Sequence, residues 1–290
     1  MEVVIGMLTP GTVVTLDVVR EAPFGYFLSD GEEDVLLHQT EIMDGFDAEE
    51  PQEVFLYQDG QGRLAATMTI PKVQINQYGW VEVVEVKERL GVFVNIGIKK
   101  DILLSVDDLP ELKQLWPEIG AKLYCALKID KKNRLFAKLA TEPEMRKLSI
   151  PAERAMLNKN ISGTVYKLLL EGTIILTTEG YIGFIHQSER KEEPRLGQTV
   201  SGRVIDVKPD GSVNISLLPR AFEQMDDDAE SIFAYLMGRG GAMPYGDKSF
   251  PEEIDKRFNM SKSAFKRALG KLMKEGRIYQ EDGWTYEKKD

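Results

Sequence analysis

The chain has 290 residues, 42% of them hydrophobic, one cysteine, two histidines and a formal net charge of −10 at pH 7. Its length suggests two to four domains. No apolar run is long enough to span a bilayer, and the N-terminus lacks the basic and apolar regions of a signal peptide. We therefore expect a cytoplasmic protein that does not contact membranes. The single Cys125 excludes an internal disulfide and favours a buried thiol.

Acidic charge is concentrated at the start of the chain. Residues 1–70 contain 14 acidic and 2 basic residues, whereas residues 71–141 contain 9 acidic and 12 basic ones. A protein that binds nucleic acid is expected to present basic charge where it meets phosphate. On charge alone, the chain after residue 70 is the better candidate for such a surface.

One pattern of five short β-rich runs, separated by Gly, Asp and Asn turns, occurs three times. The copies begin with GTVVTLDVV, GWVEVVEV and SGTVYKLLL. Five strands in so short a unit predict a small Greek-key barrel of the OB type, a fold that often binds oligonucleotides. We place unit 1 at 1–70, unit 2 at 71–141 and unit 3 at 158–219. The segment 142–157 is predicted to be a linker with a short helix after Pro151.

Residues 220–290 follow a helical period instead. AFEQMDDDAESIFAYLMG predicts one helix, and a capping box from Ser249 to Glu252 opens a second, PEEIDKRF. Ser261 is the expected N-cap of a third helix, and RIYQEDGWTY predicts a β-hairpin. The apolar face of the third helix is expected to contain Phe265, Leu269, Leu272 and Met273. The whole chain is thus predicted to be mostly β, with three tandem barrels before an α/β winged helix-turn-helix.

The three barrels resemble the S1 RNA-binding domain family, a branch of the OB fold. In that family, two rings in the second strand, a histidine in the third, and an Asp and an Arg around the last turn form one cluster. Rings stack on unpaired bases, while the histidine and arginine contact phosphate or base edges. Unit 1 has a match at every place: Phe24, Phe27, His38, Asp59 and Arg63.

Unit 2 retains part of this cluster. It keeps Phe93, Asp130 and Arg134, with Leu90 in place of the first ring and Ser105 in place of the histidine. The turn beside Arg134 is rich in lysine. The candidate RNA contacts of unit 2 are Phe93, Lys131 and Arg134.

Unit 3 keeps His186 and Asp210, but Glu171 and Ile174 replace the rings and Asn214 replaces the arginine. Two rings near its third strand either substitute for the lost ones or belong to the core. The candidate RNA contacts of unit 3 are Tyr181, Phe184, His186, Arg203 and Lys208. For every unit the alternative is a structural barrel without RNA contacts, and the acidic unit 1 is also a candidate for binding a protein partner.

The third helix of the C-terminal domain is basic opposite its apolar face. In a helix-turn-helix, the second helix of the motif is the one that enters a groove. Its candidate nucleic-acid contacts are Lys262, Lys266, Arg267 and Lys271. The alternative is an ordinary solvated helix face. The acidic run at 226–230 is interpreted as charge that complements a helix dipole, not as a metal site.

No sequence motif indicates catalysis. The chain lacks a P-loop, a GxSxG elbow and an HExxH helix, and its His and Cys content does not suit a zinc site. We therefore expect a protein that is not an enzyme, with no catalytic residues, no cofactor and no metal.

The order of three S1-like units and a winged helix resembles the conserved virulence factor B family (CvfB-like, also YitL-like) of Gram-positive bacteria. GYIGFIHQSE and SKSAFKRALGKL carry this resemblance. It implies an RNA-binding, post-transcriptional regulator that affects virulence genes, with single-stranded RNA as partner. Two alternatives stay open, a DNA-binding transcription regulator and a protein scaffold on a ribosomal or RNA-degrading complex, and so does the oligomeric state.

Overall fold

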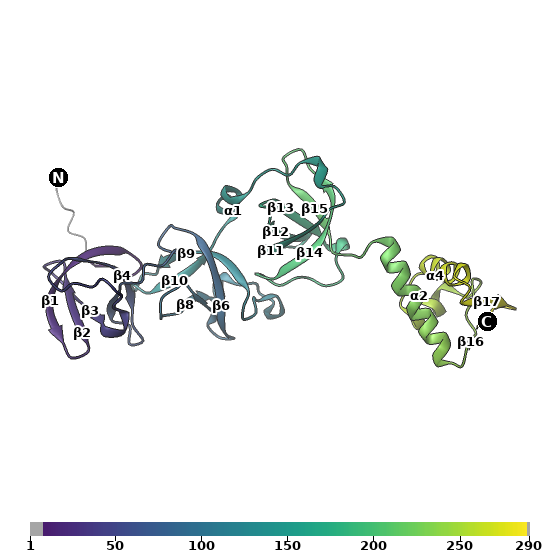
Figure 1. Ribbon diagram of the computed structural model, residues 1–290, viewed down its shortest axis with the longest axis horizontal. Coiled ribbons are helices and arrows are strands. Elements are labelled where there is room, and N and C mark those ends of the chain that lie inside the picture. The colour runs from purple at the N-terminus through teal and green to yellow at the C-terminus, as the bar shows by residue number, and fades with distance from the viewer. Residues whose placement is uncertain (1–7, 289–290) are drawn as a thin grey trace. The chain divides into compact units, whose positions relative to one another are not determined.

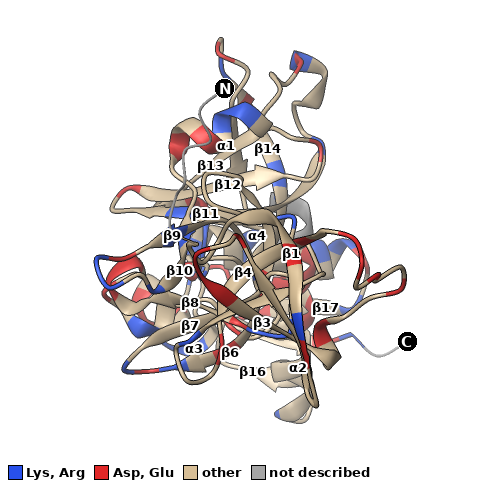
Figure 2. Cartoon of the chain, turned by 90° about the vertical axis from the view of Figure 1, so that its left-hand side faces the viewer, with Lys and Arg blue, Asp and Glu red and all other residues tan. Residues whose placement is uncertain are grey.

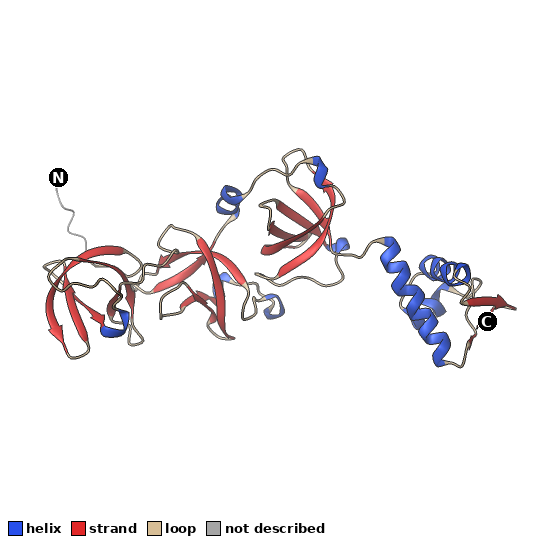
Figure 3. Ribbon diagram, viewed as in Figure 1, coloured by secondary structure: helices blue, strands red, loops and turns tan. Residues whose placement is uncertain are grey.

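The computed structural model describes residues 8–288. The chain divides into two compact parts, Met1–Leu217 and Leu218–Asp290. The first part contains three closed five-stranded barrels, and the second is a helical domain with a small sheet (Figures 1 and 3). The predicted fold class, mostly β with a C-terminal winged helix, is confirmed. Within residues 8–288, no helix has both the length and the apolar character needed to cross a membrane.

Barrel 1 closes in the strand order β1-β2-β3-β5-β4. Alternate residues point inward, so that Leu16, Leu28 and Leu37 fill the centre and their neighbours face outward. Its strands are β1 (Val13–Ala22), β2 (Gly25–Ser29), β3 (Asp34–His38), β4 (Gln52–Gln58) and β5 (Leu64–Thr67).

Barrels 2 and 3 repeat this topology, including a parallel pair between the third and fifth strands. Barrel 2 consists of β6 (Gly79–Lys87), β7 (Gly91–Asn95), β8 (Ile102–Ser105), β9 (Lys122–Ile129) and β10 (Leu135–Leu139). Barrel 3 consists of β11 (Asn160–Leu169), β12 (Gly172–Thr177), β13 (Ile182–His186), β14 (Thr199–Val207) and β15 (Val213–Ser216). In each barrel the first strand has a bulge at the same place, after Val18, Val83 and Val165.

The segment between barrels 2 and 3 forms its α-helix earlier than expected. Helix α1 (Glu142–Leu148) begins after Thr141, whose backbone N–H donates to the Glu144 carboxylate at 2.8 Å. After Pro151, where a short helix was predicted, the structure has a 3-10 helix of three residues, Arg154–Met156, and no α-helix. A proline disfavours helical backbone in the residue before it, which is consistent with a helix that ends ahead of Ile150.

The C-terminal domain contains α2 (Ala221–Gly238), β16 (Ala242–Met243), α3 (Pro251–Phe258), α4 (Lys262–Lys274), β17 (Ile278–Glu281) and β18 (Trp284–Glu287). The three strands form a sheet in the order β16-β18-β17. Helix α4 is capped by Ser261 as predicted, because its hydroxyl accepts the Ala264 N–H at 3.2 Å. The core is built around Ile232, Leu236 and Phe265.

Two details of this domain differ from the sequence prediction. Met273 is 42% exposed and therefore not part of the apolar face of α4. The predicted capping box at Ser249 does not form, because the N-cap of α3 is Phe250, whose N–H donates to the Glu253 carboxylate at 3.4 Å and whose side chain makes no capping hydrogen bond. The Ser249 hydroxyl instead accepts the Gly246 N–H at 2.9 Å. Ser249 thus stabilises the preceding turn and not the helix.

Candidate nucleic-acid interface

The outer face of barrel 1 carries two rings and a cation. Phe24 and Phe27 meet edge to face with centroids 6.4 Å apart, and Phe24 is 44% exposed. Arg20 pairs with Phe27 across β1 and β2, and its guanidinium carbon lies 4.0 Å from the centroid of the Phe27 ring. Such a cation above a ring is a favourable contact that also leaves positive charge at the surface.

His38 is half-buried and has a structural role. It pairs with Gly25 across β2 and β3, at the same end of the hairpin as Phe24. Its Nδ1 accepts the Thr40 N–H at 3.2 Å and lies 2.8 Å from the Thr40 hydroxyl, which caps a 3-10 turn. Nε2 is therefore the ring nitrogen that is available to a ligand.

The same cap explains the substitution in barrel 2. Ser105 stands at the family's histidine position and its hydroxyl accepts the Asp107 N–H, while His186 of barrel 3 accepts the Ser188 N–H. Serine preserves the turn but removes the imidazole. Barrel 2 thus keeps the geometry of this corner without the imidazole ring.

The Asp–Arg turns of barrels 1 and 2 are alike. Arg63 contacts Asp59 at 2.7 Å, and Arg134 contacts Asp130 at 2.7 Å, while both guanidinium groups stay more than half exposed. Burial alone would raise the pKa of Asp59, but hydrogen bonds from Arg63 outweigh it and lower the pKa. The Arg134 backbone N–H is the main cause of the lowered pKa of Asp130. Each arginine is thereby held in place at the edge of its barrel.

Barrel 2 presents a second ring that the sequence analysis missed. Phe93 pairs with Leu103 across β7 and β8. Strand β10 runs parallel to β8 with Ala137 beside Leu104, so the preceding residue, Phe136, lies beside Leu103. Phe93, Leu103 and Phe136 therefore form one outward row across the three strands. The Lys87 ammonium lies 5.5 Å from the Phe93 centroid, and Arg134 lies 5.3 Å from that of Phe136. Lys131 is exposed in the adjoining turn.

In barrel 3 the ring that lies beside a cation is Phe184. Its centroid lies 5.5 Å from the Lys208 ammonium and 6.3 Å from the His186 ring. These three side chains line a hollow of about 290 Å³ together with Asn214, whose buried Oδ1 has no hydrogen-bond partner among the described residues. Tyr181 instead packs partly against the barrel core. Arg203 lies on β14, half-buried, with its Nε enclosed.

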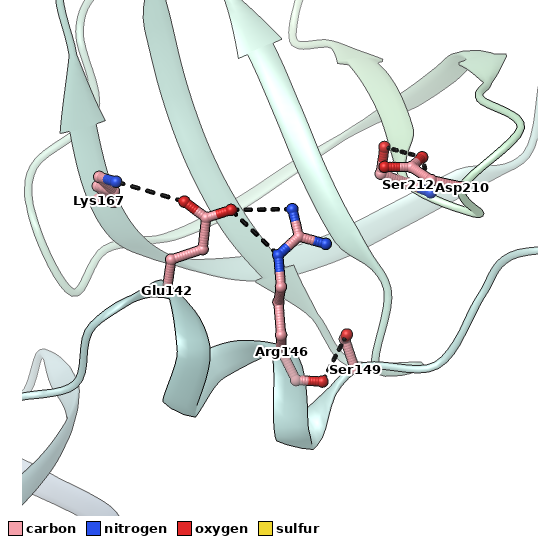
Figure 4. A network of polar contacts seen from close by, with 6 residues as sticks. All are labelled: Glu142, Arg146, Ser149, Lys167, Asp210 and Ser212. Atoms are coloured by element: carbon pink, nitrogen blue, oxygen red, sulfur yellow. Dashed lines mark hydrogen bonds and ion pairs between the residues drawn. The ribbon is translucent and has the colours of Figure 1, made fainter.

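Helix α1 brings an arginine to barrel 3, where the family arginine is replaced by Asn214. Glu142 accepts from Arg146 at 2.8 Å and forms an ion pair of 3.5 Å with Lys167 of β11 (Figure 4). The pKa of Asp210 is lowered mainly by hydrogen bonds from Ser212, and the charges of Lys208 and Arg146 add to this effect. Arg146 therefore supplies positive charge near Asp210 that the sequence repeat alone does not reveal.

The structure divides the predicted contacts of α4 into two groups. Lys266 and Arg267 are exposed, Lys262 is half-buried, and none of the three has a carboxylate partner among the side chains that the structure describes, which exclude those of residues 221–224. Lys271 is different, because its ammonium contacts the Asp226 carboxylate and lies 3.6 Å from that of Glu275. Lys271 thus lies between two carboxylates, and its predicted role as a nucleic-acid contact stays a prediction.

The hairpin of this domain adds exposed aromatic surface. The rings of Tyr279 and Tyr286 are stacked with centroids 5.2 Å apart, and Trp284 continues the stack 6.4 Å from Tyr286. Tyr279 and Trp284 are each more than 40% exposed. Among the described residues, no group of three or more His, Cys, Asp or Glu side chains is placed to hold a metal ion.

Three S1-type barrels and a winged helix are domains of nucleic-acid-binding types. Family models match four segments of the chain: S1 domain (10–69), CvfB first S1-like domain (78–138), virulence regulatory factor CvfB, second domain (145–219), and CvfB-like winged helix domain (230–286). The class is thus a multidomain protein of S1 and winged-helix type.

Whole-chain relatives agree with these matches. The chain is 53% identical to the uncharacterized protein YitL of Bacillus subtilis, over 97% of this chain and 95% of that one. It is 39% identical to conserved virulence factor B of Staphylococcus epidermidis, over 94% and 93% of the two chains. A crystal structure of a multidomain protein with nucleic acid binding domains from Streptococcus pneumoniae covers 96% of this chain and 98% of its own, at 39% identity and a TM-score of 0.66. The chain belongs to the CvfB family.

Proposed function

We propose that this protein binds single-stranded RNA in the cytoplasm and acts, without catalysis, as a post-transcriptional regulator of gene expression. One observation carries the proposal. Each barrel presents a ring on its outer face with a cation beside it: Arg20 at 4.0 Å from Phe27, Lys87 at 5.5 Å from Phe93, and Lys208 at 5.5 Å from Phe184.

A ring next to a cation suits a single strand for a physical reason. An unpaired base stacks on the ring while the cation meets the adjacent phosphate, whereas paired bases in a duplex are already stacked on one another. Each site is small and binds weakly by itself. Several such sites on one chain raise the overall affinity, because binding at one site increases the local concentration of RNA at the next.

The relatives support the regulatory part of the proposal. Several staphylococcal relatives are named conserved virulence factor B, and one family model is described as a virulence regulatory factor. A regulator of this kind acts by occupying RNA, and its S1 and winged-helix domains are binding domains. From these names we extend to this chain a role in virulence-related expression, whereas the preference for RNA is proposed from the rings and cations of the barrels.

The test is fluorescence anisotropy of the full chain with a labelled single-stranded RNA and a matched DNA duplex across a salt series. The triple variant Phe27→Ala, Phe93→Ala, Phe184→Ala should weaken RNA binding by at least about 100-fold, since base stacking contributes roughly 1–3 kcal/mol per base. Leu170→Ala is a matched control, because Leu170 is 99% exposed at a turn of barrel 3.

The competing functions predict different results. A clear preference for the duplex, lost when Lys266 and Arg267 are neutralised, would favour a DNA-binding transcription regulator that acts through α4. Absence of binding to either nucleic acid at low salt would favour a protein scaffold, with the acidic barrel 1 as the contact.

A further inference from the structure

Two neighbouring hollows in the first compact part share the side chains of Trp80 and Lys122. The larger has a volume of about 690 Å³ and is lined by residues of barrels 2 and 3, including Thr164 and Gln198. The smaller measures about 450 Å³ and includes Lys72. Ligand sites in proteins commonly enclose 300–1,000 Å³, so the larger hollow has room for a nucleoside.

Trp80 is exposed although it lies within a strand. Its side chain is 43% exposed, and its ring packs at 5.2 Å against Tyr124, its partner across β6 and β9. Tyr124 in turn stacks on Tyr78 at 5.9 Å. The indole is thus supported from one side by a ring and open to the hollows elsewhere.

The barrel fold does not require a large ring at this place. Counted back from the bulge in the first strand, the position of Trp80 corresponds to Thr15 in barrel 1 and Ser162 in barrel 3. In barrel 3 the cross-strand pair is made by two hydroxyls, Ser162 and Ser201, 2.8 Å apart. Small polar residues therefore suffice to pair these strands, and the exposed tryptophan of barrel 2 needs another explanation.

The charges and polar groups around the indole suit a nucleic acid strand. Lys72, Lys122 and Arg195 are distributed over the two hollows, with Lys122 in both. The acidic residues there are Glu82 and Glu118, and Glu118 is already paired with Arg195 at 3.1 Å. Hydroxyl and amide groups of Thr164, Thr178 and Gln198 in the larger hollow can meet the edge of a base.

We propose that Trp80 is a further RNA contact, where an unpaired base stacks on the indole and Lys122 contacts the adjoining phosphate. This inference rests on the proposed RNA-binding function and adds a site away from the outer row formed by Phe93, Leu103 and Phe136. The indole of Trp80 lies between two hollows that share the cation Lys122, an arrangement that fits an RNA strand passing over the indole from one hollow to the other. The ligand is therefore single-stranded RNA and not an isolated small molecule.

Tryptophan fluorescence of the full chain tests this site directly. Trp116 is 5% exposed and Trp284 is 41% exposed, so Trp284→Phe leaves Trp80 as the exposed indole. Titration of this variant with the single-stranded RNA used for anisotropy should quench the fluorescence, and the quenching should saturate together with the anisotropy. The matched duplex should quench far less, because paired bases cannot stack on a side chain.

Substitutions of Trp80 complete the test. Trp80→Ala should lower RNA affinity about 5- to 150-fold, the range expected for one stacked base, whereas Trp80→Phe should retain most of it. Thr15→Ala, at the same strand position in barrel 1, is the control and should bind as tightly as the unchanged chain.

The failures of the two proposals can be told apart. If the Trp284→Phe variant binds the RNA by anisotropy but shows no quenching, the Trp80 site is refuted and the proposed function stands. If the unchanged chain shows no anisotropy change at all, the proposed function fails and takes the Trp80 site with it. If Trp80→Ala also destabilises the barrel, quenching in the chain that retains Trp80 still decides the question.

Discussion

Helix α4 offers a matched comparison between free and paired cations. Lys266 and Arg267 are exposed, whereas Lys271, on the same helix, contacts the carboxylates of Asp226 and Glu275. We predict that the double variant Lys266→Gln, Arg267→Gln weakens RNA binding and that Lys271→Gln does not. Lys271→Gln should instead lower the melting temperature slightly, because it removes the cation paired with Asp226 and one of the two cations beside Glu275, which also lies 3.5 Å from Arg277.

The size of the effect follows from counterion release. Each phosphate contact on a single strand contributes about 0.7 to the slope of log K against log salt, so two lost contacts should reduce the slope by about 1.4. At about 0.1 M salt each contact is then worth roughly fivefold in affinity, and the double variant should bind about 25-fold more weakly. For Lys271→Gln the slope should equal that of the unchanged chain.

Anisotropy titrations between about 50 and 200 mM salt resolve slopes of this size. The reasoning would be refuted if Lys271→Gln reduced the slope as much as the double variant, because the ion pairs would then not hold Lys271 away from RNA. An unchanged slope in the double variant would remove α4 from the proposed RNA surface and leave the barrels as the binding elements.

Three further predictions concern the fold. Burial raises the pKa of Cys125 to about 12. Its thiol should therefore resist Ellman's reagent in the native protein and react with one equivalent of the reagent after denaturation. A rapid reaction of the native protein would contradict the buried position. Phe265→Ala should destabilise the winged-helix domain by about 3–5 kcal/mol, seen in calorimetry as a shift of one transition while that of the barrels stays in place. Gly91→Ala should disrupt the β7–β8 pairing and lower the melting temperature, because the new Cβ would lie 2.1 Å from the Leu104 carbonyl oxygen. Gly60→Ala is the control, because a Cβ at Gly60 would meet open space. Equal melting temperatures of the two variants would contradict the prediction.

The fold was predictable because its signals are local. Alternating apolar residues and turn glycines define the strands, and Ser261 marks the start of α4 within four residues of the N–H that it caps. The linker helix was misplaced for a local reason too. Proline at the second position and Glu144 favour a helix from Glu142, a signal that can be read from the sequence once Thr141 is taken as the cap.

The features that the sequence analysis missed depend on contacts between distant segments. Phe136 joins the outer row of barrel 2 only through the register that sets Ala137 beside Leu104. Lys271 is paired with Asp226, 45 residues away, and no helical period reveals that contact. Alternation shows which residues point outward, but the neighbour that covers or neutralises them is decided by tertiary packing.

Barrel 1 combines the most complete S1 cluster with a strong excess of acidic residues, and the β2–β3 register reconciles the two. Gly25 pairs with His38 at one end of the hairpin, and Ser29 pairs with Asp34 at the other, four steps or roughly 13 Å away. The acidic turn from Asp30 to Asp34 is therefore more than one Debye length, about 8 Å at physiological salt, from the Phe24 end. Its four carboxylate residues are among the Asp and Glu residues coloured red in Figure 2.

A cation from barrel 2 also reaches this edge of barrel 1. The Lys99 ammonium contacts the Thr40 carbonyl oxygen and lies 3.5 Å from the Glu41 carboxylate, beside the turn that His38 caps. Arg20 supplies a second cation at Phe27. Salt screens each exposed charge beyond about one Debye length. The balance of positive and negative charge close to the rings, and not the net charge of the barrel, should therefore govern whether a phosphate can approach. Under the proposed function, barrel 1 should therefore repel RNA at long range and low salt, and bind it at short range once the other barrels hold the strand nearby.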